Sequence, residues 1–140
     1  MCRGDTDFVF RDATGDYLLV EIERSTLRLF IQSGDPSSDL NHASTQIADW
    51  KRYIQDNLST VQRELGLVGI SSNPRSLVVI GRSANLTPEN RRKLVAMESE
   101  TPSRKIMTFD DVYENAKVLL ENMFGALDMA TANARIYYLN

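Results

Sequence analysis

The amino-acid sequence predicts one α/β (α+β) domain in which short strands alternate with helices. The chain has 140 residues, of which 42% are hydrophobic and 25% charged, and this length and composition suit one globular domain. The spacing of the apolar residues changes along the chain between a strand-like period of two and a helical period near 3.6. The predicted order is strand, strand, helix, strand, helix, strand, helix, which is typical of a sheet with helices packed on it.

The first two strands are predicted to form a β-hairpin. Phe8–Phe10 is a short apolar run, residues 12–16 have turn composition, and Tyr17–Glu23 is rich in residues that suit strands. The second run is apolar on both faces until Glu21. We therefore expect a largely buried strand, with the carboxylates of Glu21 and Glu23 at its C-terminal end.

The middle of the chain contains the clearest helix. Residues 27–32 alternate in hydrophobicity, which predicts either another short strand or an extended arm, and residues 33–39 have loop composition. Apolar residues then recur at spacings of four and three, as one face of a helix requires. They are Ala43, Ile47, Trp50, Ile54, Leu58, Val61 and Leu65. Gly66 follows the last of them and predicts the end of the helix.

A buried strand and a capped helix follow. Leu77–Ile80 is a short, continuous apolar run with β-branched residues, which favours a buried strand over a helix. Thr87 followed by Pro88 predicts a helix start, because a capping residue precedes a proline at the first helical position. We expect this helix to run to about Glu98.

The last predicted elements are a strand and a helix. Ile106–Phe109 is the strand, and Asp110 is the expected N-cap of the helix. The apolar face of that helix consists of Val112, Ala116, Leu119, Leu120 and Met123. We assign residues 1–127 to the domain and residues 128–140 to a C-terminal tail.

Composition excludes several kinds of site. The chain has one cysteine, Cys2, and one histidine, His42, which excludes a disulfide framework and two-histidine metal motifs and makes a cysteine-based metal site very unfavourable. No apolar run approaches the roughly 20 residues that span a bilayer, and the polar residues 1–7 carry no signal peptide. We therefore expect a cytoplasmic protein with no membrane partner.

The net charge of −3 argues against a wholly basic nucleic-acid binder, yet residues 75–105 hold seven bases and three acids.

Three acidic residues form the strongest candidate site. Glu21 and Glu23 are two apart on a predicted strand and so point to the same face, and Asp7 precedes the neighbouring strand. Three carboxylates on one patch repel each other unless a cation binds them, and oxygen ligands suit Mg²⁺ or Mn²⁺. Hydrolysis of phosphodiesters uses such a site. The alternative is that these are solvent-facing acids at strand ends.

Asp7, the triplet Glu21-Ile22-Glu23 and Gln46 resemble the pattern of the PD-(D/E)XK nuclease superfamily. That pattern is an acid, an acid-x-lysine pair on the next strand, and often a glutamine on the next helix. The stretch Gln46–Trp50 is similar to the Gln-x-x-x-Tyr box of some branches, and the chain most resembles the Shedu anti-phage nuclease domain. The segments that carry the resemblance span residues 7 to about 124; they are Asp7–Phe10, Leu19–Arg24, Ala43–Trp50, Val79–Arg82 and Met107–Asp111.

The resemblance implies a restriction-endonuclease-like core, with a mixed central sheet flanked by helices, and a Mg²⁺- or Mn²⁺-dependent DNA endonuclease. Asp7, Glu21 and the backbone carbonyl of Ile22 would bind the metal. Glu23 would act as a general base or a third ligand, and Gln46 would fix a metal-bound group or a phosphate. The candidate contacts to DNA phosphates are Arg24, Arg28, Lys51, Arg52 and Arg82.

Two departures from the family pattern define the alternative function. Glu23 occupies the position of the lysine, although some enzymes of this fold carry glutamate there. The family usually has a helix and a strand before the first acid, and here only six residues precede Asp7, so we expect these elements to be missing or to belong to a longer protein. The alternative is therefore a catalytically inactive nuclease-fold domain that serves DNA binding or assembly; an unrelated α/β ligand-binding domain is a distant third.

The family also implies a homo-oligomer. Sheet edges carry unpaired backbone groups that proteins usually cover, so the edge of the N-terminal hairpin is one expected interface. The last helix is the other, because it presents Leu119, Leu120, Met123 and Phe124.

Overall fold

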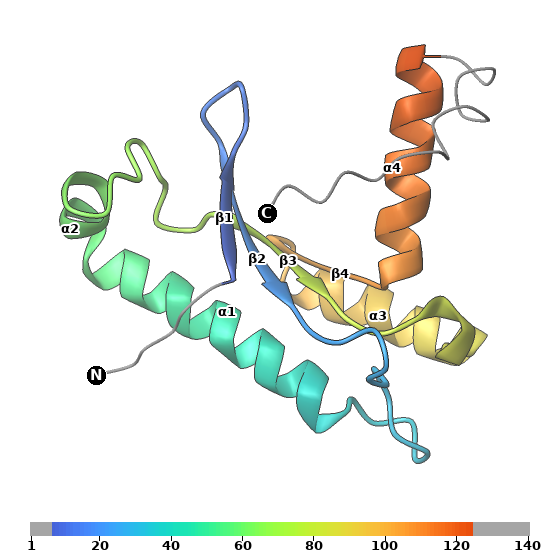
Figure 1. The fold of residues 1–140 in the computed structure, drawn as a ribbon. Coiled ribbons are helices and arrows are strands. Elements are labelled where there is room, and N and C mark those ends of the chain that lie inside the picture. Colours follow the sequence, from blue (N-terminus) through green and yellow to red (C-terminus); the bar gives the residue numbers. More distant parts are fainter. Residues whose placement is uncertain (1–6, 125–140) are drawn as a thin grey trace.

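The computed structural model describes residues 7–124, and these form a four-stranded mixed sheet flanked by helices, as predicted (Figure 1). The sheet order is β1-β2-β3-β4, with β1 antiparallel to β2 and the other pairs parallel. The elements, in chain order, are β1 Phe8–Arg11, β2 Tyr17–Ile22, α1 Ser38–Asp56, α2 Leu58–Arg63, β3 Arg75–Val79, η1 Ser83–Asn85, α3 Pro88–Glu100, β4 Arg104–Met107 and α4 Phe109–Phe124.

The predicted hairpin of β1 and β2 is confirmed. Its turn is held by Asp12, whose Oδ1 accepts hydrogen bonds from the N–H groups of Thr14 and Asp16, both at 2.9 Å. Gly15 takes a φ of +93° in this turn, a left-handed conformation that glycine adopts without strain. In the register of the pair Phe8 lies opposite Val20. This turn chemistry is local, which is why the sequence predicts it well.

The two faces of the sheet differ. One face carries Leu19, Val78 and Ile106, which are buried in a single core together with residues of α1 and α3. The other face carries the rings of Phe8 and Phe10, which are 50% and 55% exposed and stack with centroids 6.0 Å apart. Helix α1 therefore covers only one face, and Glu21 belongs to that covered face.

The single long helix predicted between Ala43 and Leu65 is two helices. Helix α1 begins earlier, at Ser38, because the Ser37 side chain caps it and accepts from the Leu40 N–H at 3.1 Å. It ends at Asn57, whose φ of −130° is not helical and whose side chain and N–H both donate to the Tyr53 carbonyl. Asparagine competes for local backbone groups in this way, and the apolar spacing alone does not reveal it.

Residues 27–32 form the extended arm rather than a strand. Their one sheet-like contact is an isolated bridge between Phe30 and Pro36. Leu29 and Phe30 are nevertheless buried, so the alternation reflects packing of the arm onto the core. The arm crosses the end of β3 at Gly81, where an added Cβ would lie 2.4 Å from the Leu27 carbonyl oxygen. Gly81 also has a φ of +67°, so no other residue fits there without strain.

The start of α3 is confirmed and the cap of α4 is corrected. Thr87 and Asn90 form a capping box at α3, with Pro88 at the first helical position. At α4 the cap is Thr108, not Asp110: the Thr108 hydroxyl accepts from the Asp111 N–H, and the Asp111 carboxylate accepts from the Thr108 N–H. Strand β4 accordingly ends at Met107, two residues before the predicted end.

Helix α4 stands away from the rest of the domain (Figure 1). It contacts β4 and η1 near its start, whereas Leu119 and Met123 farther along are 59% and 63% exposed. None of the helices in residues 7–124 is both long and apolar enough to cross a membrane. The predicted domain end at 127 and the tail 128–140 lie outside the described residues.

Candidate functional site

Asp7 and Glu21, which we call the acid pair, meet where β1 begins and β2 ends. The register that pairs Phe8 with Val20 places Asp7 opposite Glu21 when it is continued by one residue. The Asp7 carboxylate accepts a hydrogen bond from the Ile22 N–H at 2.7 Å, which fixes it against β2. Glu21 is only 4% exposed, and its Oε2 is buried without a hydrogen-bond partner in the described part of the chain. A buried carboxylate oxygen with no donor is costly unless another group satisfies it.

The charge of Glu21 is unfavourable in this position. Burial raises its pKa, the neighbouring Asp7 carboxylate raises it further, and the pKa reaches about 7. The Asp7 N–H opposes this by stabilising the charged form, and Glu23 adds a smaller upward effect. At neutral pH the Glu21 carboxyl group is therefore partly protonated, and a bound cation would compete with that proton.

Glu23 lies beyond this pair. Its N–H donates to the Val79 carbonyl at 2.8 Å, so the β2 ladder continues through it, and its side chain is partly exposed. Within residues 7–124 no group of three or more His, Cys, Asp or Glu side chains has a metal-binding arrangement. The expectation that Asp7, Glu21 and Glu23 converge on one ion is therefore corrected: the structure brings together two carboxylates.

Asp7, Glu21 and Ile22 still fit a magnesium or manganese ion. These ions commonly take one or two protein carboxylates and complete their coordination with water and substrate oxygens. The unpartnered Oε2 of Glu21 is a suitable ligand atom, because a cation would both satisfy it and offset the repulsion from Asp7.

Gln46 extends the site along α1. It is partly buried, and its Oε1 is buried without a hydrogen-bond partner among the described residues. Trp50 and Tyr53 follow it at i+4 and i+7, so all three share one side of the helix. Trp50 packs partly against the core, as its place in the apolar stripe predicts, but its indole Nε1 is also buried and without an acceptor in residues 7–124.

The aromatic pair was not predicted from the sequence as a feature of the site. The rings of Trp50 and Tyr53 meet edge to face, with centroids 5.9 Å apart and an interplanar angle of 81°. The spacing of Gln46, Trp50 and Tyr53 carried the signal: the resemblance placed Trp50 at the aromatic position of the Gln-x-x-x-Tyr box, whereas the apolar pattern placed it in the core.

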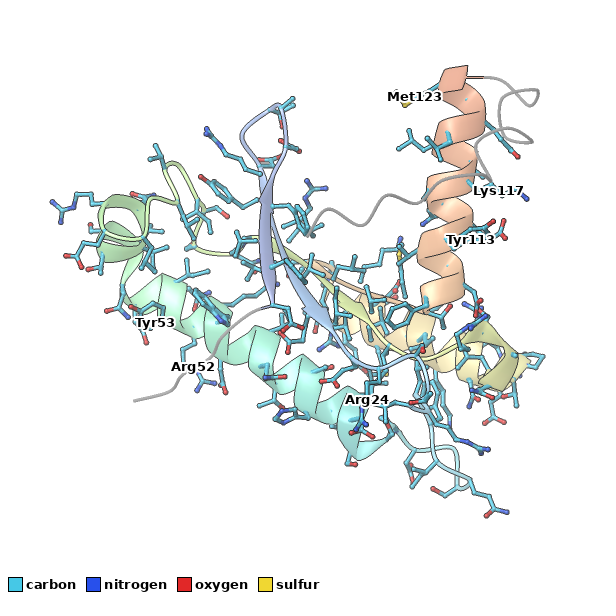
Figure 2. All side chains as sticks on the ribbon, in the orientation of Figure 1. Arg24, Arg52, Tyr53, Tyr113, Lys117 and Met123 are labelled. Atoms are coloured by element: carbon cyan, nitrogen blue, oxygen red, sulfur yellow. The ribbon has the colours of Figure 1, made fainter. Side chains whose placement is uncertain are left out.

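The five predicted phosphate contacts separate into two groups. Arg24, Arg28 and Arg52 are exposed, and Figure 2 shows Arg24 and Arg52 toward opposite ends of α1. The Arg52 side chain is 73% exposed, and its guanidinium lies 3.9 Å from Asp49, a weak surface pair that leaves it accessible.

Lys51 and Arg82 have structural roles instead. Lys51 is 9% exposed and donates to the Ser103 hydroxyl at 2.6 Å, so it holds α1 against the loop before β4. Burial and the nearby Arg104 lower its pKa. Arg82 binds both carboxylate oxygens of Asp110 at 3.0 Å and fixes η1 to the start of α4. The phosphate contacts predicted for Lys51 and Arg82 stay predictions: Lys51 is covered, whereas the Arg82 side chain is 57% exposed.

The comparisons with known proteins agree with the resemblance to Shedu proteins. No curated protein matches the chain. The family model described as the Shedu protein SduA, C-terminal, matches residues 2–113, which include β1 to β4, the acid pair and Gln46. Because this match covers most of the 140 residues, the chain belongs to the family of Shedu SduA C-terminal domains.

Proposed function

We propose that this domain is a Mg²⁺- or Mn²⁺-dependent DNA endonuclease of the PD-(D/E)XK type that acts in anti-phage defence in the cytoplasm. The observation that carries the proposal is the buried Glu21 carboxylate, whose pKa the neighbouring Asp7 raises and whose Oε2 has no hydrogen-bond partner among residues 7–124. Membership of the Shedu family supports the defence role.

The residues at and around the acid pair would have different roles in catalysis. Asp7 and Glu21, with the Ile22 carbonyl, would hold the ion, and the hydrogen bond from the Ile22 N–H keeps Asp7 in place for it. When bound, the ion would lower the pKa of an attacking water and stabilise charge at the phosphate. Glu23, partly exposed near the pair, would act as the general base, and Gln46 on α1 would orient the water or a phosphate oxygen.

The DNA backbone lies along the cations that remain accessible. Arg24, Arg28 and Arg52 are exposed on the loop after β2 and on α1. Charged contacts of this kind position the duplex or strand without reading its sequence. Binding should therefore weaken steeply with salt, as counterion release requires.

Calorimetry with Mn²⁺ tests the metal site without any need for activity. We expect binding to the parent chain and none to Asp7→Asn or Glu21→Gln. Asp56→Asn is the matched control, because Asp56 is an exposed carboxylate at the end of α1, and it should bind as the parent does. Equal Mn²⁺ affinity in all four proteins would overturn the proposal.

Glu23 distinguishes the proposed enzyme from the inactive alternative. If it acts as the base, Glu23→Gln abolishes cleavage and leaves DNA and Mn²⁺ binding unchanged. Glu23→Lys restores the commoner family pattern and retains cleavage. Cleavage by Glu23→Gln at the parent rate would remove Glu23 from the mechanism, whereas no cleavage by the parent or by Glu23→Lys would favour a binding role.

A further inference from the structure

A partly exposed aromatic pair lies on α1, the helix that covers the sheet face to which Glu21 belongs. Tyr53 is 42% exposed, although its ring packs edge to face on Trp50, which is itself partly buried. The pair thus has a fixed geometry on the inner side, where Trp50 contacts the core, and an open ring surface on the outer side.

Two buried polar atoms on this side of α1 have no hydrogen-bond partner in residues 7–124. They are Oε1 of Gln46 and Nε1 of Trp50, which are one helical turn apart. Most buried polar atoms in folded proteins are satisfied, so an open acceptor and an open donor on one side of a helix suit a bound molecule that offers both a donor and an acceptor.

A cation is adjacent to the pair in the sequence. Arg52 precedes Tyr53 on α1, where Figure 2 labels both residues, and its side chain is 73% exposed. An aromatic ring with a neighbouring accessible guanidinium matches one nucleotide, because the ring takes the base and the cation takes the phosphate.

We propose that Trp50 and Tyr53 form a stacking platform for an unpaired base, so that the site takes single-stranded DNA beside the acid pair. This inference rests on the proposed nuclease function and specifies its substrate. In a duplex each base is already stacked on its neighbours and presents only its edges in the grooves, whereas a single strand offers the face of the base. The platform therefore favours a single strand or a locally opened duplex over an intact one.

Trp50 is the only tryptophan of the chain, so its fluorescence reports this site alone. Titration of the full chain with an oligothymidine in EDTA, where no metal-dependent cleavage occurs, should quench the tryptophan emission. A duplex of the same length should quench it much less at equal phosphate concentration. Tyr53→Ala should weaken single-strand affinity at least about fivefold, and Tyr53→Phe, which keeps the ring, should retain it.

Tyr113→Ala is the matched control, because Tyr113 is 61% exposed on α4 and belongs to no part of the site. Its affinity should equal that of the parent. Circular dichroism of each variant separates lost binding from lost folding. Equal single-strand affinity in Tyr53→Ala and the parent, or equal quenching by duplex and single strand, would overturn the platform.

The stacking platform and the proposed nuclease function would be refuted by different experimental results. Asp7→Asn should bind the oligothymidine as the parent does while losing Mn²⁺ binding and cleavage. Normal quenching with no metal binding would refute the nuclease and leave a single-strand binder. Cleavage without quenching would keep the nuclease and refute the platform.

Discussion

The two edges of the sheet differ in whether their polar groups have hydrogen-bond partners. At the β4 edge the N–H groups of Arg104, Ile106 and Thr108 donate to the Thr101 carbonyl and to the carboxylates of Glu98 and Asp111, at 2.9–3.0 Å. These bonds close the edge within the chain itself, which protects it from pairing with other strands.

The β1 side has the opposite character. There the acid pair is on β1 and β2, Gln46 and the Trp50–Tyr53 pair are on α1, and polar atoms of Glu21, Gln46 and Trp50 are buried without partners in the described residues. At the β4 edge the backbone N–H groups are satisfied within the chain, although the buried Nε of Arg104 also has no partner in the described residues. A side chain at the closed edge should affect stability, and one at the open side should affect binding and chemistry.

The largest expected effect is on cleavage. Glu21→Gln removes a proposed metal ligand, so the rate on plasmid DNA with Mg²⁺ should fall at least about 100-fold, an order typical for loss of a group that stabilises transition-state charge. Gel assays of nicked and linear products measure it. Asp16→Asn, in the exposed hairpin turn, is the control and should cleave at the parent rate. A Glu21→Gln protein that cleaves normally would contradict the assignment of the open side.

The same substitution should stabilise the metal-free fold. The pKa of Glu21 is raised from 4.5 to about 7, so the folded protein binds this proton more tightly than the unfolded chain does. Stability contributed by the protonated group is present below pH 4.5 and is lost as the pH rises through 7. Glu21→Gln should therefore increase the free energy of unfolding at pH 8 by about 2–3 kcal/mol.

Urea unfolding in EDTA at pH 8 and pH 4 measures this difference. The gain should disappear at pH 4, where the parent Glu21 is protonated and resembles glutamine. A loss of stability at pH 8 would mean that Glu21 forms favourable contacts in its charged form, and the comparison of the two edges would fail at its central residue.

The closed edge should respond in the opposite sense. Glu98→Ala removes the acceptor of the Ile106 N–H in the middle of β4, so it should cost about 1–2 kcal/mol of unfolding free energy and leave DNA binding unchanged. Glu100→Ala, on the exposed end of the same helix, should cost less than about 0.5 kcal/mol. Equal stability of the two variants would show that the Glu98 bond does not close the edge.

Gln46→Ala completes this test from the open side. The buried Oε1 of Gln46 has no hydrogen-bond partner in residues 7–124, so the free energy of unfolding should stay within about 0.5 kcal/mol of the parent value. Cleavage should nevertheless fall about tenfold, as expected for a residue that orients a ligand or a metal-bound group. A stability loss without any loss of cleavage would place Gln46 with the structural residues.

The sequence predicts the parts of this fold that depend on neighbouring residues. The hairpin turn around Asp12 and the cap at Thr87 were correctly placed, because their hydrogen bonds join residues within four positions. The Asp7–Glu21 pair was predicted as well, from strand alternation and the family pattern.

Contacts between residues that are far apart in the sequence could not be predicted from the sequence. Lys51 looks like a surface cation on α1, and only the fold shows Ser103, 52 positions away, over its ammonium group. Arg82 likewise has its partner 28 positions away, at Asp110, which the sequence had assigned to a helix cap. The orphaned Nε1 of Trp50 could not be foreseen either, because apolar periodicity records which face a residue occupies and nothing about its polar atom.

The smallest effect on stability is expected at α4, outside both edges. Its apolar stripe, represented by Leu119 and Met123, is 59% and 63% exposed, so replacing both with serine should change the free energy of unfolding by less than about 0.5 kcal/mol. Exposed apolar surface of this extent marks an interaction site, and we propose that it joins copies of this chain into a dimer or larger homo-oligomer.

Light scattering after size-exclusion chromatography, at a protein concentration of tens of micromolar, measures the oligomeric state. The parent should elute as an oligomer and the double variant as a monomer. Val68→Ser, in the loop after α2 and equally exposed at 63%, should leave the oligomer intact. A monomeric parent would contradict the association. If Leu119→Ser with Met123→Ser instead destabilised a monomer by several kcal/mol, the stripe would be covered within the chain, and α4 would belong with the closed side of the fold.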